Sequence, residues 1–408
     1  MTGRVSRGLF TLAWLCAYPL FALNVALEAY TGRAVDGLYS IGMALACAAG
    51  LGAMWRWRLG ALDAAFAAFM AWVALRTGAG YALGQHAAHE LGTYALMMGW
   101  YAGAYALGRS LDLPAGRGRL VAALLLPVAA LLPLVDWSFF YLAARYQEHG
   151  QSYSVYQGVA RSVAMVAILA LCAARRPAAD GLIVAVTVAA LFVIGARSEF
   201  YSFTGAAAMA LVLPNLGRRR VWLAGGAVLA VAAAALALHV VAGGSLAIDP
   251  DTSRVYELLS GQSTSLAARL ALFRPILGPW LDGDLSFLFG DLLSYQRITG
   301  STGLYIHNAL SVLTDFGLPG FGLYAGLCAA AAAVLLRAHD GEAPFGLRIL
   351  AGFSLLMVLA AKSLFWSEVA LFWGVAAQVA AARAQRAPDP AGPSALAPPA
   401  LPGAARAS

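Results

Sequence analysis

Charged residues are scarce in this chain, where they make up 12% of 408 residues, against roughly 25% in soluble domains. Hydrophobic residues make up 61%, and the mean hydropathy is +0.73. So apolar a composition excludes an ordinary soluble domain and indicates a membrane protein. The net charge of +7 does not indicate a nucleic-acid partner, because no soluble basic face is present to bind one.

The sequence also has few cysteines and lacks the common cofactor-binding motifs. The sequence has no Walker A motif and no Gly-x-Gly-x-x-Gly after a strand. No cluster of His, Asp or Glu has the spacing of metal ligands. The four cysteines lie inside apolar runs, too dispersed for a metal site and too buried for a disulfide framework; they are Cys16, Cys47, Cys172 and Cys328. We therefore expect no metal and no cofactor.

Apolar runs recur along nearly the whole chain, each about 20 residues long, the length of a helix that crosses a bilayer. Such spans are helices because a lipid-exposed backbone must satisfy its own hydrogen bonds. We therefore predict an all-α polytopic membrane protein with about 12 transmembrane helices. The spans lie near residues 8–28, 35–54, 61–79, 91–110, 119–135, 155–174, 180–196, 199–216, 221–243, 308–336, 347–365 and 367–384.

Two other regions complete the predicted organisation. The transmembrane domain occupies residues 1–386, and one large loop, residues 244–306, separates the ninth and tenth helices. The tail, residues 387–408, is rich in Pro and Ala and is expected to be disordered. The first span follows Arg4 and Arg7 as a signal peptide would, but it is long and many spans follow, so we interpret it as a retained helix.

The distribution of basic residues predicts the orientation. With the N-terminus in the cytoplasm, most of the 27 Lys and Arg residues fall on the inner side, as the positive-inside rule requires. Three polar regions then face outward, near residues 136–154, 195–202 and 244–306.

Three residues in or beside the outward-facing regions are candidates for chemistry. Arg197 lies between two apolar runs, where a guanidinium costs roughly 2.5–3.5 kcal/mol at a helix centre. It either pairs with Glu199 or extends to the headgroups, or it binds an anion through its planar fork. Arg269 is either a solvated residue of an amphipathic helix or part of the same site. His307 precedes the next apolar run, where it is either an ordinary interface histidine or a group that exchanges protons near neutral pH.

These motifs together resemble a known family. An Arg-Ser pair in a short outward turn, an Arg in the large loop, and His307-Asn308 before a Gly-x-x-Gly segment resemble the O-antigen ligase and polymerase superfamily. These are the WaaL-like and Wzy-like bacterial membrane glycosyltransferases. The resemblance covers the number of helices, the position of the large loop, and local motifs between about residues 190 and 325.

The resemblance implies a GT-C-like fold in the bacterial inner membrane, with the active site facing the periplasm. It implies that glycan is taken from an undecaprenyl-diphosphate carrier without a metal or a nucleotide sugar. It also implies that Arg197 and Arg269 bind the diphosphate, and that His307 assists the acceptor hydroxyl.

The implied chemistry agrees with the residue types. Fixed guanidinium groups can stabilise a leaving diphosphate, and His307 can accept the proton of the attacking hydroxyl. Direct attack inverts the anomeric carbon, although Glu199, Asp284 and Asp291 leave a double displacement open. Sugar hydroxyls are expected to be positioned by Tyr305, Asn308 and Glu199.

The acceptor and the class of protein remain open at this point. A polymerase passes the chain to a lipid-linked repeat unit, whereas a ligase passes it to lipid A-core. The residues around His307 and Arg197 resemble O-antigen or exopolysaccharide polymerases more closely. In addition, Pro275–Pro279 matches only part of the ligase Pro-x-x-Gly-x-Gly element. Membrane lipids, and a flippase or chain-length regulator, are further expected partners. A secondary transporter or glycan flippase is the alternative of another class, although residues 1–200 and 201–408 show no paired repeats.

Overall fold

The protein was analysed as a computed structural model, which describes residues 3–33, 35–84, 88–110, 117–134, 155–172, 177–212, 271–272, 274–278, 283, 286–299, 308–336 and 345–386. Every regular element in these ranges is a helix, which confirms the all-α prediction. The elements are α1 (Gly3–Ala17), α2 (Pro19–Thr31), α3 (Leu38–Ala53), η1 (Met54–Arg56), α4 (Ala61–Ala82), α5 (Ala88–Arg109), α6 (Arg117–Leu131), η2 (Leu132–Leu134), α8 (Val155–Cys172), α9 (Pro177–Ile194), α10 (Arg197–Val212), α14 (Ser286–Phe289), α15 (Ser294–Thr299), α16 (Leu310–Leu336), α17 (Phe345–Ala360) and α18 (Glu368–Arg386).

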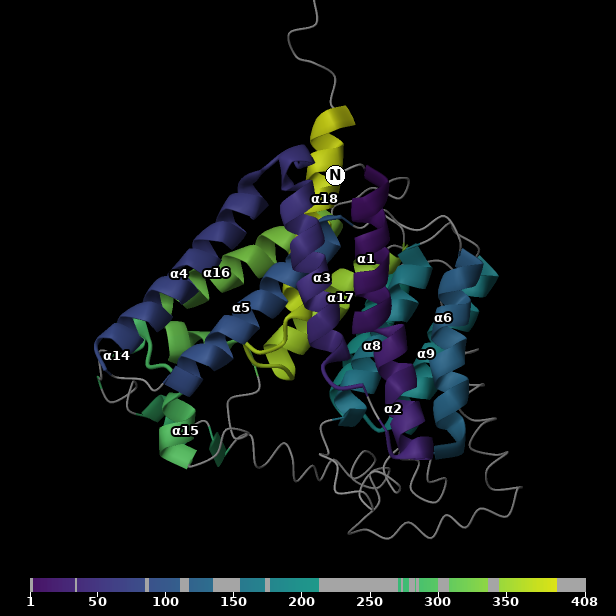
Figure 1. The fold of residues 1–408 in the computed structure, drawn as a ribbon, viewed down its shortest axis with the longest axis horizontal. Helices are drawn as coiled ribbons and strands as arrows, with labels where there is room; N and C mark the ends of the chain where they lie inside the picture. The colour runs from purple at the N-terminus through teal and green to yellow at the C-terminus, as the bar shows by residue number, and fades with distance from the viewer. Residues whose placement is uncertain are drawn as a thin grey trace, which may run out of the picture.

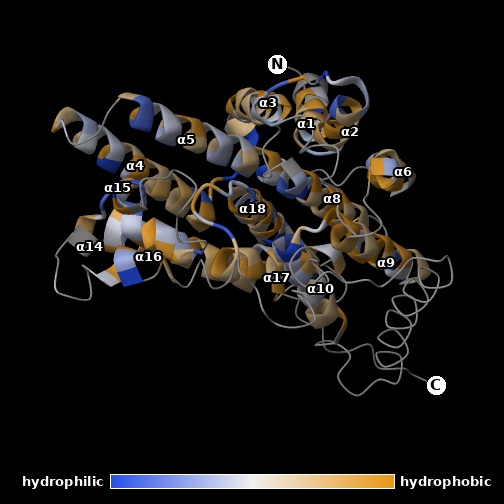
Figure 2. Cartoon of the chain, turned by 90° about the horizontal axis from the view of Figure 1, so that it is seen from below, coloured by the Kyte–Doolittle hydropathy of each residue, from blue (hydrophilic) through white to orange (hydrophobic). Residues whose placement is uncertain are grey.

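The helices follow the apolar runs of the sequence. Each predicted span overlaps a helix, except 221–243, which lies outside the described residues. Within the described residues, four helical stretches are long and apolar enough to cross a membrane, namely Arg7–Thr31, Leu38–Arg56, Ala61–Ala82 and Leu310–Leu336. Shorter apolar helices accompany them, and hydrophobic positions are prominent on α8, α9 and α17 in Figure 2. The chain is therefore a helical membrane protein, while the number of about 12 spans and the GT-C-like arrangement stay predictions.

The helices form a bundle with two distinct ends. The N-terminus of α1 and the last turns of α18 lie at one end, which we call the terminal end (Figure 1). We call the opposite end the far end, and α2, α6 and α15 reach farthest in that direction (Figure 1). Helix α3 runs back alongside α1, and α18 ends at the terminal end. The N-terminal residues of α3 and of α18 therefore lie nearer the far end.

Small residues and aromatic rings hold the bundle together. Helices α5 and α18 approach closely at Gly108 and Gly374, where a Cβ atom would overlap the backbone of the other helix. Glycine at such contacts is typical of helix packing in membranes. Beside this contact, the fully buried Trp373 packs against Phe66, Phe69, Tyr101 and Tyr324.

A buried ion pair braces the terminal end. Arg109 is 2% exposed, and its Nε lies 3.0 Å from Oδ1 of Asp63, which also accepts a hydrogen bond of 2.9 Å from Tyr105. The Nη2 of Arg109 donates to the carbonyl of Arg58. This cluster joins the start of α4 to the end of α5.

Three interruptions distinguish the structure from a set of plain spans. Residues 8–28, predicted as one span, are two helices that meet at Tyr18 and Pro19. Helix α16 is kinked at Gly317. The run 347–365 ends as a helix at Ala360, and residues 361–367 form a non-helical link before α18. The candidate site lies beside this link.

Candidate functional site

A buried carboxylate on the first turn of α10 forms the centre of the site. Glu199 is fully buried, and its Oε1 lies 2.8 Å from Nζ of Lys362 in the link between α17 and α18. The ammonium group of Lys362 also donates to Gln157 on α8, at 2.8 Å. The hydroxyl of Ser198 donates to Oε2 of Glu199, at 2.6 Å. Oε2 of Glu199 therefore accepts a hydrogen bond, and Oε1 is held by the ion pair with Lys362; a buried charge requires such pairing.

A second buried ion pair joins α8 to α18. The Nε of Arg161 lies 3.2 Å from Oε1 of Glu368, which is fully buried in the first turn of α18. The same oxygen accepts a hydrogen bond of 2.8 Å from Tyr39, the second residue of α3. The guanidinium of Arg161 lies over the Tyr39 ring, 3.9 Å from its centroid, a cation–π contact. Both carboxylates occupy helix N-termini, where the helix dipole favours negative charge.

The turn that follows His307 is bonded to the same link. The amide of Ala309 donates to the carbonyl of Val358 at 2.8 Å, and the amide of Leu364 donates to Oγ of Ser311 at 2.8 Å. These bonds hold the start of α16 against the residues on both sides of Lys362. The Arg197–Glu199 segment and the Asn308–Ser311 turn, far apart in sequence, are thus connected through residues 358–364.

The structure places only part of the predicted site. Arg197 is half-buried as the first residue of α10, and Glu199 is buried two residues later. Asn308 is half-buried, and its Oδ1 accepts the amide hydrogen of Leu310 at 2.9 Å. That oxygen helps to start α16. Arg269, Tyr305, His307, most of the loop 244–306 and the tail 387–408 lie outside the described residues.

Four residues of this site are missing from the sequence-based prediction, namely Tyr39, Arg161, Lys362 and Glu368. Arg161 and Lys362 fall inside predicted spans, and an ionisable residue within a span is a functional candidate by default. Lys362 has a second signal, because it is the only lysine among the 27 Lys and Arg residues of the chain.

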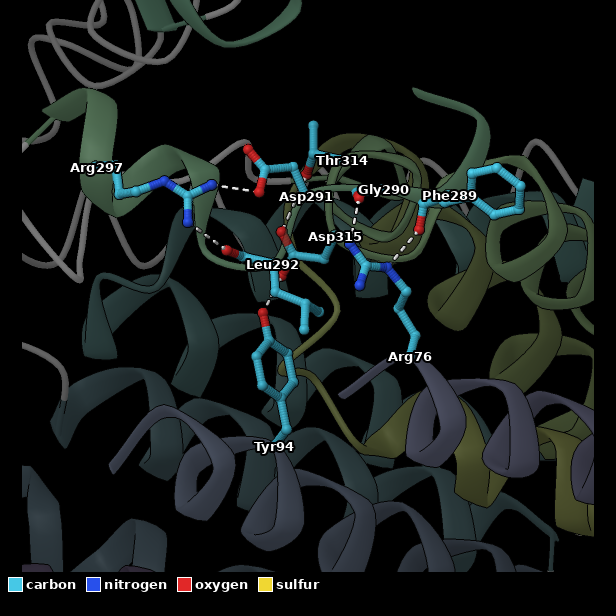
Figure 3. A network of polar contacts seen from close by, with 9 residues as sticks. All are labelled: Arg76, Tyr94, Phe289, Gly290, Asp291, Leu292, Arg297, Thr314 and Asp315. Carbon is cyan, nitrogen blue, oxygen red and sulfur yellow. Dashed lines mark hydrogen bonds and ion pairs between the residues drawn. The ribbon is translucent and has the colours of Figure 1, made fainter. Parts of the chain in front are cut away.

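A second polar network anchors the segment that precedes His307 (Figure 3). Arg76 on α4 donates from Nε to the carbonyl of Phe289 at 2.9 Å, and from Nη2 to the carbonyl of Gly290 at 2.8 Å. The amide of Asp291 donates to the carbonyl of Thr314 on α16 at 2.7 Å. We call these contacts the latch.

The latch uses the kink of α16. Gly317 has φ 68°, a left-handed conformation that glycine adopts without steric penalty, and Pro319 cannot donate a helical hydrogen bond. Beside the kink, the carbonyl of Phe316 accepts a hydrogen bond of 2.8 Å from the indole of Trp72 on α4. Gly290, also left-handed, packs so closely on the kink that a Cβ atom there would overlap the backbone of Asp315.

Two carboxylates complete the latch. Asp315 is fully buried, and its Oδ2 accepts a hydrogen bond of 2.6 Å from Tyr94 on α5. Asp291 pairs with Arg297 on α15, and this hydrogen bond raises the pKa of the guanidinium. The amide of Asp291 is thus bonded to Thr314, and that of Ala309 to Val358.

Replacing Arg76 by methionine should release the latch. Two hydrogen bonds from a charged donor would be lost, and each is worth about 1.5–3 kcal/mol. We expect faster amide exchange in residues 286–299, measured by mass spectrometry on peptides, while α3 and α5 keep their protection. Arg33→Met, a change at an exposed arginine, is the matched control. Unchanged exchange at residues 289–291 in the Arg76 variant would show that the latch is not held by this arginine.

Comparison of the chain with protein-family models, with curated proteins and with solved structures gave no match. Within the residues that the structure describes, no group of three or more His, Cys, Asp or Glu side chains is placed to hold a metal ion.

Proposed function

We propose that this protein is a membrane glycosyltransferase of the O-antigen or exopolysaccharide polymerase type. It would transfer glycan from an undecaprenyl-diphosphate carrier to a lipid-linked repeat unit. One observation carries the proposal, namely the cluster of buried ion pairs beside Arg197 that is bonded to the turn after His307. Ionisable groups inside an apolar bundle are costly to bury and typically mark a functional site.

The residue types suit the departure of a diphosphate. Arg197 is the first residue of α10, and a helix N-terminus favours a bound phosphate. Negative charge grows on the diphosphate as its bond to the anomeric carbon breaks, so a guanidinium in a poorly hydrated site lowers the barrier. Arg269, predicted at the same diphosphate, would add a second guanidinium.

His307 completes the proposed reaction. The acceptor hydroxyl oxygen forms the new bond to the anomeric carbon, and the bond from that carbon to the diphosphate oxygen breaks. The hydroxyl proton moves to His307 as general base, and undecaprenyl diphosphate leaves with the bonding electron pair. A single displacement of this kind inverts the anomeric configuration.

We assign the far end of the bundle to the periplasm. Arg56 and Arg58 lie between α3 and α4, and Arg383 lies in the last turns of α18, all at the terminal end. The positive-inside rule places such residues in the cytoplasm. The carrier-linked substrates would then reach the site from the periplasmic leaflet of the inner membrane.

A transporter or glycan flippase is the second candidate function. It is favoured by the break between α1 and α2, by the kink of α16, and by the ion pairs buried in the bundle. Broken helices and buried charges are typical of secondary transporters.

An assay with purified protein in detergent separates these functions. We expect a lipid-linked repeat unit to be converted into longer lipid-linked products, also in excess EDTA, because leaving-group stabilisation is assigned to arginine. Transfer to lipid A-core in place of a second repeat unit would identify a ligase. No transfer to either acceptor, together with movement of the lipid-linked glycan across vesicle membranes, would show a flippase and reject the proposal.

A further inference from the structure

We propose that Lys362 is a cation of the diphosphate site and acts together with Arg197. This inference rests on the proposed function, and it assigns a substrate contact to a residue that the family-based expectation does not include. The ligand class is an oxyanion with more than one negative charge, with diphosphate as the group of interest.

The residue type at position 362 supports this role. Apart from the histidines, all basic residues of the chain are arginines except Lys362. An ammonium group is compact and has three donors that rotate freely, whereas a guanidinium is a large planar fork. A site enclosed by Glu199 and Gln157, each 2.8 Å from Nζ, suits the smaller cation.

The burial of the ion pair between Lys362 and Glu199 also supports this role. The side chain of Glu199 is 0% exposed and that of Lys362 is 15% exposed, so the accessible part of the pair belongs to the cation. An ammonium group has three N–H donors. Nζ donates one of them to Gln157 and forms an ion pair with Oε1 of Glu199, which accepts no hydrogen bond among the described residues, so an N–H of the ammonium group can meet a ligand oxygen.

Charge balance supports this role as well. Arg197 and Glu199 are two residues apart at the start of α10, so Lys362 is held near Arg197 through their common neighbour. Two cations brought together in a poorly hydrated site would repel strongly. Glu199 reduces this repulsion while the site is empty, and a diphosphate supplies further negative charge when it binds. Hydrogen bonds between such cations and phosphate oxygens are about twice as strong as neutral ones.

A single lysine allows a direct measurement on the wild-type protein. Lysine labelled with ¹⁵N at Nζ, incorporated into a chain whose tag contains no lysine, gives one side-chain signal, that of Lys362. We expect inorganic diphosphate to shift this signal saturably, with the same dissociation constant as its inhibition of transfer, and inorganic phosphate to bind at least tenfold more weakly. A signal that does not move while diphosphate inhibits transfer would overturn the proposal.

Two substitutions separate ligand binding from a purely structural ion pair. Lys362→Met should raise the dissociation constant for inorganic diphosphate at least tenfold. Glu199→Gln should leave it unchanged or lower it, because the ammonium group loses its neutralising partner and becomes more attractive to an anion. A structural ion pair predicts instead that both variants weaken binding alike, and that result would also overturn the proposal.

The matched control is Asp63→Asn, which breaks the buried ion pair with Arg109 at the other end of the bundle. It should lower the melting temperature without changing the dissociation constant for diphosphate. Diphosphate binding through Lys362 in a protein that transfers no glycan would reject the proposed function alone. Normal transfer by Lys362→Met with an unchanged donor KM would reject the role of Lys362 alone.

Discussion

Replacing His307 by alanine is expected to slow glycan transfer by about 10²–10⁴-fold, the usual contribution of a general base. The acceptor hydroxyl would then have to lose its proton to water, whereas the diphosphate would still meet its cationic side chains. A single-turnover assay with purified lipid-linked donor measures the rate, and a direct binding assay measures donor affinity. We expect the rate to fall while the dissociation constant of the donor changes little.

Two variants make this result specific. His89→Ala removes an exposed histidine from the first turn of α5 and should leave the rate unchanged. Arg197→Lys keeps the charge but loses the bidentate fork, so it should weaken donor binding as well as slow transfer. Near-normal transfer by both His307→Ala and Arg197→Lys would show that the two residues are structural and that the proposed mechanism is wrong.

Replacing Glu368 by alanine is expected to destabilise the protein by about 3–5 kcal/mol, as for other buried ion pairs that lose one partner. The cause is Arg161, which would keep its charge inside the bundle after losing the carboxylate 3.2 Å away. Tyr39 would lose its hydrogen bond to the same oxygen. The free energy of unfolding, measured by denaturant titration in detergent micelles, should fall accordingly.

The double variant Arg161→Met/Glu368→Gln gives the control for this prediction. Removing both charges of a buried pair is often neutral for stability, so the double variant should be more stable than Glu368→Ala, although the cation–π contact between Arg161 and Tyr39 is lost. A double variant as unstable as Glu368→Ala would show that the carboxylate stabilises the bundle by packing and hydrogen bonding rather than by pairing with Arg161.

The helices could be predicted well from sequence. In lipid, an apolar run of bilayer length has few ways other than a helix to pair its backbone N–H and C=O groups in hydrogen bonds. Interruptions within the runs were harder to predict. The run 347–365 is predicted as one span, but its helix ends at Ala360. Lys362 lies in the non-helical link that follows, where it pairs with Glu199. Similarly, α16 reads as one long span, and its kink at Gly317 is stabilised by donors from α4 and from the segment before α15.

For the candidate site too, some residues could be recognised from the sequence, whereas their partners became known only from the structure. Arg197 and Glu199 could be identified from the sequence, because charged residues between two apolar runs are easily recognised there. The pairing partners were missed, because no pattern within α10 indicates which residue of another helix will lie opposite Glu199. Arg161 and Glu368 each look like an isolated charge in an apolar stretch, and only their contact 3.2 Å apart shows them as a pair.

That this protein is helical and membrane-embedded follows from its composition, because burying apolar side chains and pairing backbone groups in lipid depend on the local sequence. Which charged side chains meet in the interior depends on how the helices pack. Packing brings α3, α8, α10 and the α17–α18 link together, so that Lys362 neutralises Glu199, and Glu368 neutralises Arg161, where water is largely excluded. A buried charge is stable only beside a partner of opposite sign, and that partner is chosen by the fold.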